Sequence, residues 1–256
     1  MQWVNVDKIS QAIEKGRELL LATSSPQTVF YLSGGSTPKP LYEVLSQEKL
    51  FHPGAVGMID ERYGPKWHEK SNELMMKKSG LLDYLKGEDI PFHPILHERH
   101  SGEQSEPRID PGQSSSTSSE HSQDDGLIRS AEEYNQVMKS LHAHYSRHVA
   151  LLGMGADGHI AGLVAQSAKL KVQNAKLFNS ANMVIGYTDE KMGERITQTF
   201  HSLSMMDEIF VLVLGEEKKK ALENMKEDGT EEEIPARFLM RDTISPKVTI
   251  ITDQIL

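Results

Sequence analysis

Asp157 and His159 lie two residues apart in a glycine-rich segment that directly follows an apolar run at residues 149–152. Such a run predicts a buried strand, and the glycines let the backbone turn sharply at its carboxyl end, where open α/β sheets bind ligands. A histidine there can exchange protons near neutral pH, and the aspartate can orient its ring or bind a substrate hydroxyl. The segment is also typical of a turn whose polar residues only cap the next helix. A ligand site is therefore expected only if a second segment indicates the same edge of the sheet.

A second apolar run, residues 29–32, leads into a turn of glycines and hydroxyls. The turn consists of Gly34, Gly35, Ser36 and Thr37. Glycines let the backbone approach an anion, and Pro38 suits the first turn of a helix whose free N–H groups favour negative charge. We expect a phosphate-binding turn followed by a helix from residue 38 to about residue 47. An ordinary strand-to-helix turn is the alternative, because the segment matches neither the Walker pattern nor the dinucleotide fingerprint.

Three cationic side chains occur near the ends of expected elements. Arg62 follows Asp60 and Glu61 at the end of an expected strand over 55–59, and its planar guanidinium matches phosphate oxygens. A surface ion pair is the alternative for this segment. Arg195 precedes an expected strand over 209–214, and Lys218 follows that strand within one turn of helix. Because two further lysines follow Lys218, a solvated helix face is the alternative there.

Strands and helices alternate along most of the chain. The sequence predicts helices over 9–21, 38–47, 71–84, 127–147 and 216–226, and strands over 29–32, 55–59, 149–152, 183–187, 209–214 and 248–252. A chain of 256 residues can bury one full core. We therefore expect an α/β fold, a single domain over residues 1–256 with a mostly parallel, doubly wound sheet flanked by helices.

Residues 98–126 break this alternation, because they are dominated by Ser, Glu, Gln, Asp, Gly and Pro. With Ile109 almost alone as an apolar residue, burial cannot offset the cost of ordering the backbone. We expect a disordered, low-complexity insert within the one domain. The histidines at 97, 100 and 121 are interpreted as solvent-exposed side chains and not as metal ligands.

Composition limits the classes of function. The net charge of −9, with no basic stripe, argues against nucleic acid as a partner, and the absence of cysteine excludes disulfides and thiolate metal sites. No apolar run approaches the roughly 20 residues that span a bilayer, and the first residues do not form a signal peptide. These features predict a cytoplasmic protein without a membrane partner, a monomer or small homo-oligomer, whose ligand is a small molecule.

The order and spacing of these segments resemble the glucosamine-6-phosphate isomerase/6-phosphogluconolactonase family, over most of the chain outside the insert. The matching stretches are residues 32–38, 60–62 with 65 and 71–72, 152–159, 195–197, and 215 with 218. The resemblance is greatest to the lactonases. It implies a hydrolase without metal or cofactor that opens 6-phosphoglucono-1,5-lactone to 6-phosphogluconate in the oxidative pentose phosphate pathway.

The resemblance also implies roles for individual residues. His159 matches the catalytic histidine, a general base for water, and Asp157 would hold the imidazole or the substrate. The implied sugar-phosphate contacts are Gly34, Gly35, Ser36, Thr37, Asp60, Arg62, Asn72, Arg195 and Lys218. The donors to the oxyanion stay unassigned.

Three departures from the family pattern bear on specificity. Residues 160–165 replace the usual Ser-Leu-Phe-Pro, residues 188–193 form a charged and more flexible segment in place of a proline-rich loop, and His148 stands where lactonases often carry Asp. A deaminase is one alternative, but residues 160–167 lack the acid that deaminases carry after the histidine. A non-catalytic sugar-phosphate sensor is the other alternative.

Overall fold

The structure is a computed structural model, and it describes residues 1–97, 121–165, 180–190 and 192–255. Most of the insert expected over 98–126 therefore lies outside the described residues. Its last part does not match the expectation, because helix α5 (His121–His144) begins six residues before the expected start at Leu127.

Within the described residues, seven strands form one fully parallel sheet in the order β1-β10-β9-β6-β2-β3-β5. The strands are β1 (Gln2–Asn5), β2 (Thr28–Leu32), β3 (Ala55–Met58), β5 (Phe92–His93), β6 (Arg147–Gly153), β9 (Glu208–Val213) and β10 (Val248–Thr252). Every residue of β2, β3 and β10 is buried, as expected for strands covered on both faces. The predicted α/β class with a mostly parallel, doubly wound sheet is confirmed.

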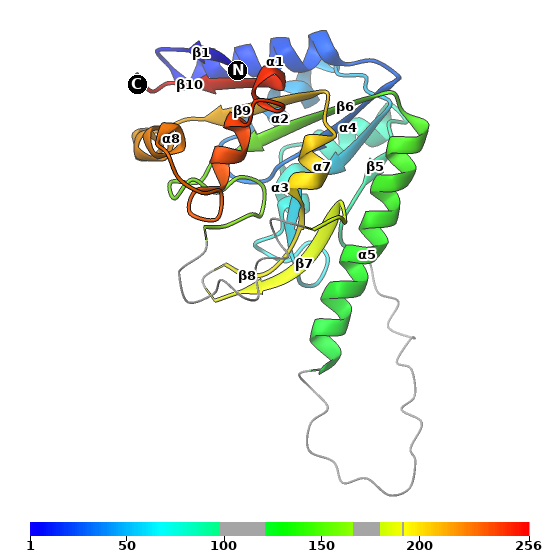
Figure 1. Ribbon diagram of the computed structural model, residues 1–256. Coiled ribbons are helices and arrows are strands. Elements are labelled where there is room, and N and C mark those ends of the chain that lie inside the picture. The colour runs from blue at the N-terminus through cyan, green and yellow to red at the C-terminus, as the bar shows by residue number, and fades with distance from the viewer. Residues whose placement is uncertain (98–120, 166–179, 191, 256) are drawn as a thin grey trace, which may run out of the picture.

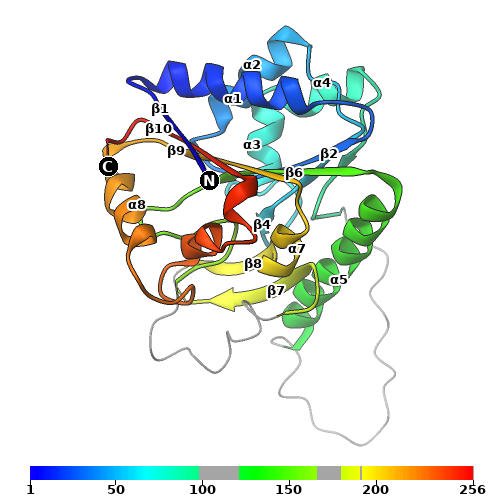
Figure 2. The same ribbon diagram turned by 45° about the horizontal axis from the view of Figure 1, so that its top comes forward.

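Helices cover both faces of this sheet (Figures 1 and 2). Helices α1 (Ile9–Thr23), α2 (Lys39–Glu48) and α4 (Leu81–Gly87) lie on one side, and α5 and α7 (Phe200–Ser204) lie on the other. In α1 the buried positions Ala12, Ile13, Gly16 and Leu20 follow the helical repeat, which explains why one stripe of this helix packs inward. Helix α8 (Lys219–Lys226) follows β9 through the 3₁₀ turn η1 (Glu216–Lys218).

The order of the strands reverses between β2 and β6. From β2 the chain moves outward to β3 and β5, and it then returns to the other side of β2 and continues through β6, β9 and β10. Such a reversal leaves a crevice at the carboxyl ends of the two central strands, which is where doubly wound sheets bind ligands. The two glycine-rich segments follow these two strands.

A second, antiparallel sheet was not predicted from the sequence. It has the order β4-β8-β7, with β4 (Asp60–Arg62), β8 (Gly193–Gln198) and β7 (Val184–Asp189), and α5 packs against β7 and β8. Residues 188, 189 and 193 were expected in a flexible segment, but they pair in the β7–β8 hairpin; Lys191 lies outside the described residues. A three-residue strand has too few positions to show a period, and β8 mixes Arg, Thr and Gln with a single isoleucine.

Two helix boundaries also differ from prediction. The helix expected over 71–84 is divided into α3 (Asn72–Lys78) and α4, because Gly80 adopts a left-handed conformation with φ of 83°. The start at Ser71 is as expected, since its hydroxyl accepts a hydrogen bond from Leu74 N at 3.1 Å. The helix expected to reach Arg147 ends at His144, and Arg147 is the first residue of β6.

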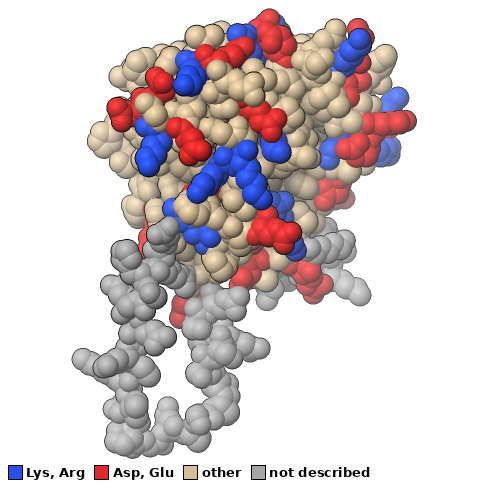
Figure 3. Space-filling view, turned by 180° about the vertical axis from the view of Figure 1, so that it is seen from behind, with Lys and Arg blue, Asp and Glu red and all other residues tan. Residues whose placement is uncertain are grey.

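Figure 3 shows Lys and Arg side chains interspersed with Asp and Glu on the face that lies behind the view of Figure 1. In the described part of the chain, no helix combines the length and the apolar character needed to cross a membrane.

Candidate active site

Asp157 and His159 are held by a tight turn after β6. Gly155 N donates to His159 O at 2.8 Å, and Gly158 N donates to Gly155 O at 3.0 Å. This turn brings Asp157 Oδ1 to 2.6 Å from His159 Nδ1 and 3.2 Å from His159 N. A Cβ on Gly155 would lie 2.1 Å from His159 Nδ1, so only glycine leaves room for the imidazole in this position.

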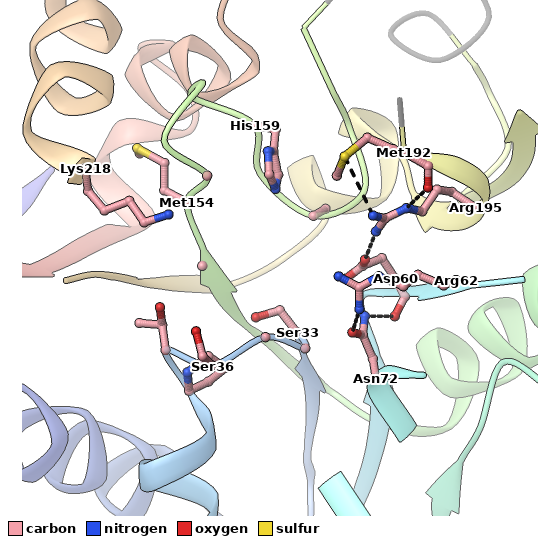
Figure 4. Close-up of a pocket in the computed structure, with 17 residues that line it drawn as sticks. Ser33, Ser36, Asp60, Arg62, Asn72, Met154, His159, Met192, Arg195 and Lys218 are labelled. Atoms are coloured by element: carbon pink, nitrogen blue, oxygen red, sulfur yellow. Dashed lines mark hydrogen bonds and ion pairs between the residues drawn. The ribbon is translucent and has the colours of Figure 1, made fainter. Parts of the chain in front are cut away.

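The charge of Asp157 fixes the tautomer of His159. The hydrogen bond from His159 lowers the pKa of Asp157 to about 2, so its carboxylate is an acceptor near neutral pH. The imidazole must therefore donate from Nδ1, which leaves the lone pair on Nε2 for proton transfer. His159 lines a pocket at the switch point (Figure 4), whereas Asp157 contacts the histidine and not the pocket.

The pocket collects nearly all the residues predicted from the sequence. It is lined by Ser33, Gly34, Gly35, Ser36, Thr37, Pro38, Asp60, Arg62, Asn72, Gly153, Met154, Gly155, His159, Ala161, Met192, Arg195 and Lys218. Asp157 is the one predicted site residue outside this lining. In Figure 4, Lys218 lies on one side of His159 and Arg195 on the other.

The turn after β2 forms the floor of the pocket beside the N-terminus of α2. Gly35 has φ of 99°, a left-handed conformation that other residues adopt at a cost. A Cβ on Gly34 would lie 2.0 Å from Asn72 Cγ, so this glycine is needed for the close approach of the two segments. Pro38 is the N-cap of α2, and Ser36 and Thr37 precede it in the lining. The predicted turn and helix start are therefore confirmed, while their role toward phosphate stays a prediction.

Arg62 and Arg195 are cross-strand neighbours, because they pair directly in the antiparallel β4–β8 ladder. Like charges in such positions repel, and the pKa of Arg62 is lowered by burial first and then by the charge of Arg195. Arg62 Nη1 donates to Asn72 Oδ1 at 2.7 Å and to Lys70 O at 2.9 Å. Two guanidinium groups held this close form a site that an anion would stabilise.

Asp60 partly compensates the positive charge of Arg62 and Arg195. Its carboxylate lies 3.4 Å from Arg195 Nη1, and both side chains are almost fully buried. Burial raises the pKa of Asp60, and the charges of Arg195, Arg62 and His159 oppose that rise. Asp60 is thus the buried counter-ion of Arg195 at the edge of the pocket.

Glu61 is a structural residue of the site that was not among the predicted site residues. Its fully buried carboxylate accepts hydrogen bonds from Arg62 N, Asn72 N, Glu73 N and Ser71 Oγ at 2.7–2.9 Å. It therefore joins β4 to the start of α3 and fixes the positions of Arg62 and Asn72. In the sequence, Glu61 lies only ten and eleven residues before Ser71 and Asn72. That spacing alone does not indicate that the three residues are in contact.

Lys218 reaches the pocket from the η1 turn after β9. Lys218 N donates to Gly215 O at 3.0 Å, and Gly215, with φ of 101°, donates its own N–H to Asp253. Lys220 instead pairs with Glu223 on α8 and with Glu227, the C-cap of that helix. Of the lysines at 218–220, only Lys218 is among the lining residues, which agrees with its choice from the sequence.

The departures at 160–165 and 188–193 do contribute to the pocket wall, through Ala161 and Met192. Gly162 N donates to Thr197 Oγ1 at 2.9 Å, and Tyr187 donates its hydroxyl to Gly162 O, so β7 and β8 hold the segment after His159. Sequence reasoning did not assign these two wall residues individually, because apolar side chains carry no chemical signature. His148 lies outside the lining, stacked on His142 with ring centroids 3.7 Å apart.

Comparisons with known proteins point to one family. The family model described as "Glucosamine-6-phosphate isomerases/6-phosphogluconolactonase" matches residues 6–249. A 6-phosphogluconolactonase of Nostoc sp. is 30% identical over 81% of this chain and 75% of its own length. One of Helicobacter pylori is 25% identical over 84% of this chain and 80% of its own length.

Solved structures share the fold. A 6-phosphogluconolactonase from Shewanella baltica superposes with a TM-score of 0.72 at 17% identity, covering 98% of this chain and 97% of that one. One from Trypanosoma brucei gives a TM-score of 0.68 at 22% identity, covering 98% and 95%. Since the family model spans nearly the whole chain, including every segment that lines the pocket, the chain belongs to the glucosamine-6-phosphate isomerase/6-phosphogluconolactonase family.

Proposed function

We propose that this protein hydrolyses 6-phosphoglucono-1,5-lactone to 6-phosphogluconate, a reaction of the oxidative pentose phosphate pathway. The observation that carries the proposal is the Asp157–His159 pair, 2.6 Å apart, beside a pocket lined by three cationic side chains. A base next to an anion site suits a phosphorylated substrate whose carbonyl is attacked by water. The names of the relatives above support this substrate.

His159 Nε2 takes a proton from water while the water oxygen bonds to the lactone carbonyl carbon. The carbonyl electron pair moves to its oxygen and gives a tetrahedral intermediate. On collapse, the bond from the carbonyl carbon to the ring oxygen breaks, and the imidazolium returns the proton to that oxygen. The carboxylic acid so formed then loses its proton to solvent. General acid–base help of this kind contributes about 10²–10⁴-fold in rate.

The remaining lining residues bind and position the substrate. Ser36, Thr37 and Lys218 would bind the phosphate, and all three line the pocket. In Figure 4, Ser36 and Lys218 lie on one side, and Arg62 and Arg195 add two guanidinium groups on the other. Gly34 and Gly35 let the backbone approach the ligand, and Asn72 holds Arg62 in place. Binding energy from these contacts would be used to place the carbonyl carbon near His159.

Hydrolysis is favoured over the deaminase reaction by two features of the site. Asp60, the position that a deaminase would use as a base, is buried as the counter-ion of Arg195. Residues 160–165 after His159 carry no acid to assist ring opening. The proposal includes no metal and no cofactor, and it places the enzyme in the cytoplasm as a monomer or small homo-oligomer.

The test is hydrolysis of freshly generated 6-phosphogluconolactone by wild type and His159→Ala, corrected for spontaneous opening, with ammonia release from glucosamine-6-phosphate measured alongside. We expect a rate well above background in wild type and a loss of at least about 10²-fold in the folded variant. Ammonia release without lactone hydrolysis would establish a deaminase. Sugar-phosphate binding without either reaction would establish a sensor.

A further inference from the structure

Ser33 is the first residue after β2, and its backbone is fixed at the switch point of the sheet. Its N–H donates to Leu151 O on β6 at 3.0 Å, and its carbonyl accepts a hydrogen bond from the Tyr42 hydroxyl at 2.7 Å. Tyr42 is fully buried in α2. Two central strands and one helix therefore determine where the Ser33 side chain lies.

The hydroxyl of Ser33 has no hydrogen-bond partner in the described part of the chain, although its residue is only 4% exposed. A buried hydroxyl without a partner destabilises the fold, because it loses its hydrogen bonds to water and gains none. The same residue lines the pocket, where Figure 4 shows it across from His159 and between Ser36 and Asn72. Its backbone is fixed by the fold, whereas its Oγ is directed to the space that the substrate would occupy.

The chemistry of Ser33 differs from that of its neighbours in the lining. Anionic substrate oxygens would find charged donors in Lys218 on one side and in Arg62 and Arg195 on the other. A neutral hydroxyl both donates and accepts, which is the hydrogen-bonding pattern of another hydroxyl. The position between the two cationic sides suits the uncharged middle of a sugar phosphate.

We propose that Ser33 Oγ binds one ring hydroxyl of the sugar. It thereby contributes to recognition of the sugar part of the substrate and makes no contribution to binding of the phosphate group. This proposal rests on the proposed function for the identity of the sugar. The residue takes no part in proton transfer, so it is a specificity-determining residue of the His159 reaction.

The first test compares Ser33→Ala with wild type. Because the hydroxyl has no protein partner, we expect Tm to stay the same or rise, while kcat/KM for the lactone falls about tenfold. Ser24→Ala is a matched control, because Ser24 Oγ is also buried and has no hydrogen-bond partner among the described residues. Ser24 is the C-cap of α1, lies before the start of β2 and does not line the pocket. Ser24→Ala should leave kcat/KM unchanged. Unchanged kcat/KM in Ser33→Ala would overturn the proposal.

The second test identifies the hydroxyl and excludes a merely structural effect. Lactones of the 2-deoxy, 3-deoxy and 4-deoxy analogues of glucose 6-phosphate are assayed with wild type and Ser33→Ala. For the one analogue that lacks the partner hydroxyl, wild type and variant should have the same kcat/KM, and the tenfold difference should remain for the others. An equal loss with all three analogues would show that Ser33 binds no ring hydroxyl and would overturn the proposal.

A binding measurement separates this proposal from the proposed function. Calorimetric titration uses 6-phosphogluconate, the open-chain product, which keeps the C2, C3 and C4 hydroxyls that the lactone carries on its ring. Its binding to Ser33→Ala should be about tenfold weaker, and titration with inorganic phosphate should show no difference. If wild type binds 6-phosphogluconate but does not hydrolyse the lactone, the proposed function fails while the role of Ser33 is still decided by these titrations. Equal affinities of wild type and variant for 6-phosphogluconate would overturn the role of Ser33.

Discussion

At the scale of residues, His159 is the group proposed to transfer the proton, and the carboxylate of Asp157 orients it. Asp157 does not line the pocket, yet it determines which nitrogen of His159 carries the hydrogen. Because Asp157 acts through His159 and does not line the pocket, its loss should lower kcat more than it raises KM. The pair therefore offers a test in which the two kinetic constants separate.

Asp157→Asn should lower kcat by about 10²-fold with little change in KM. An amide is neutral and can donate as well as accept, so it no longer fixes the Nδ1–H tautomer and no longer stabilises the imidazolium. Steady-state kinetics on the lactone measure this change. A rise in KM at constant kcat would instead mean that Asp157 binds substrate.

The same carboxylate makes stability depend on acid pH. Its pKa is about 2 in the folded protein, below its ordinary value of 3.8, so the folded state favours the ionised form. The resulting stabilisation is present above pH 3.8 and is lost as pH falls toward 2. Wild type should therefore be more stable than Asp157→Asn in urea unfolding at pH 6, and the difference should shrink toward pH 2. A difference that grows as pH falls would contradict the assignment.

At the scale of elements, the turn after β6 shows how a backbone conformation creates a catalytic geometry. Gly155→Ala places a Cβ 2.1 Å from His159 Nδ1 and 2.6 Å from Asp157 Oδ1, so the imidazole must move. We expect about a 10²-fold loss of kcat with native secondary structure by circular dichroism. Gly87→Ala is the control, because its Cβ would meet no atom within 4 Å and it ends α4 outside the pocket. Full activity in Gly155→Ala would refute the steric argument.

The β4–β8 pair leads to a different prediction, because a bound anion would stabilise its directly paired Arg62 and Arg195. Inorganic phosphate should raise Tm of the wild type, and Arg62→Gln should reduce that rise while raising Tm without phosphate or leaving it unchanged. Differential scanning calorimetry in sulfate-free buffer at fixed ionic strength measures Tm with and without phosphate. Lys15→Gln on α1, whose partner is Glu18, should keep the wild-type response. An equal response in Arg62→Gln would place the anion elsewhere.

The elements also show why sequence reasoning predicted most strands of the parallel sheet but only one strand, β7, of the antiparallel sheet. Strands β2 and β6 contain continuous apolar runs, residues 29–32 and 149–152, that lead into glycine-rich turns, so both their burial and their carboxyl ends could be predicted. The β4–β8–β7 sheet has no such pattern, because its pairing depends on long-range contacts with α5 that no local period records. For the same reason Arg62 and Arg195 were predicted as separate cations, and their direct pairing became visible only in the fold.

At the scale of the whole molecule, the topology gathers residues from distant parts of the chain. Segments at 33–38, 60–72, 153–161, 192–195 and 218 meet because each follows a strand or pairs with one at the same edge of the fold. The alternation of strands and helices was sufficient to predict this edge. The orphaned hydroxyl of Ser33 and the hydrogen-bond partners of Glu61 were not predictable, because they depend on which groups the packing brings together.

The last prediction concerns residues 100–119, which we propose to be an insert that neither the fold nor the reaction requires. The described groups that hold the site come from other segments, and α5 beyond it packs on β7 and β8 through its described part. Replacing 100–119 by a short Gly/Ser linker should change Tm by only a few degrees and leave kcat/KM within about twofold, since loop length alters closure entropy only slowly. The replacement stops before His121 so that α5 keeps its first turn. A folded variant that had lost its lactonase activity would show instead that this segment contributes to the site, and a variant that failed to fold would show that it belongs to the core structure.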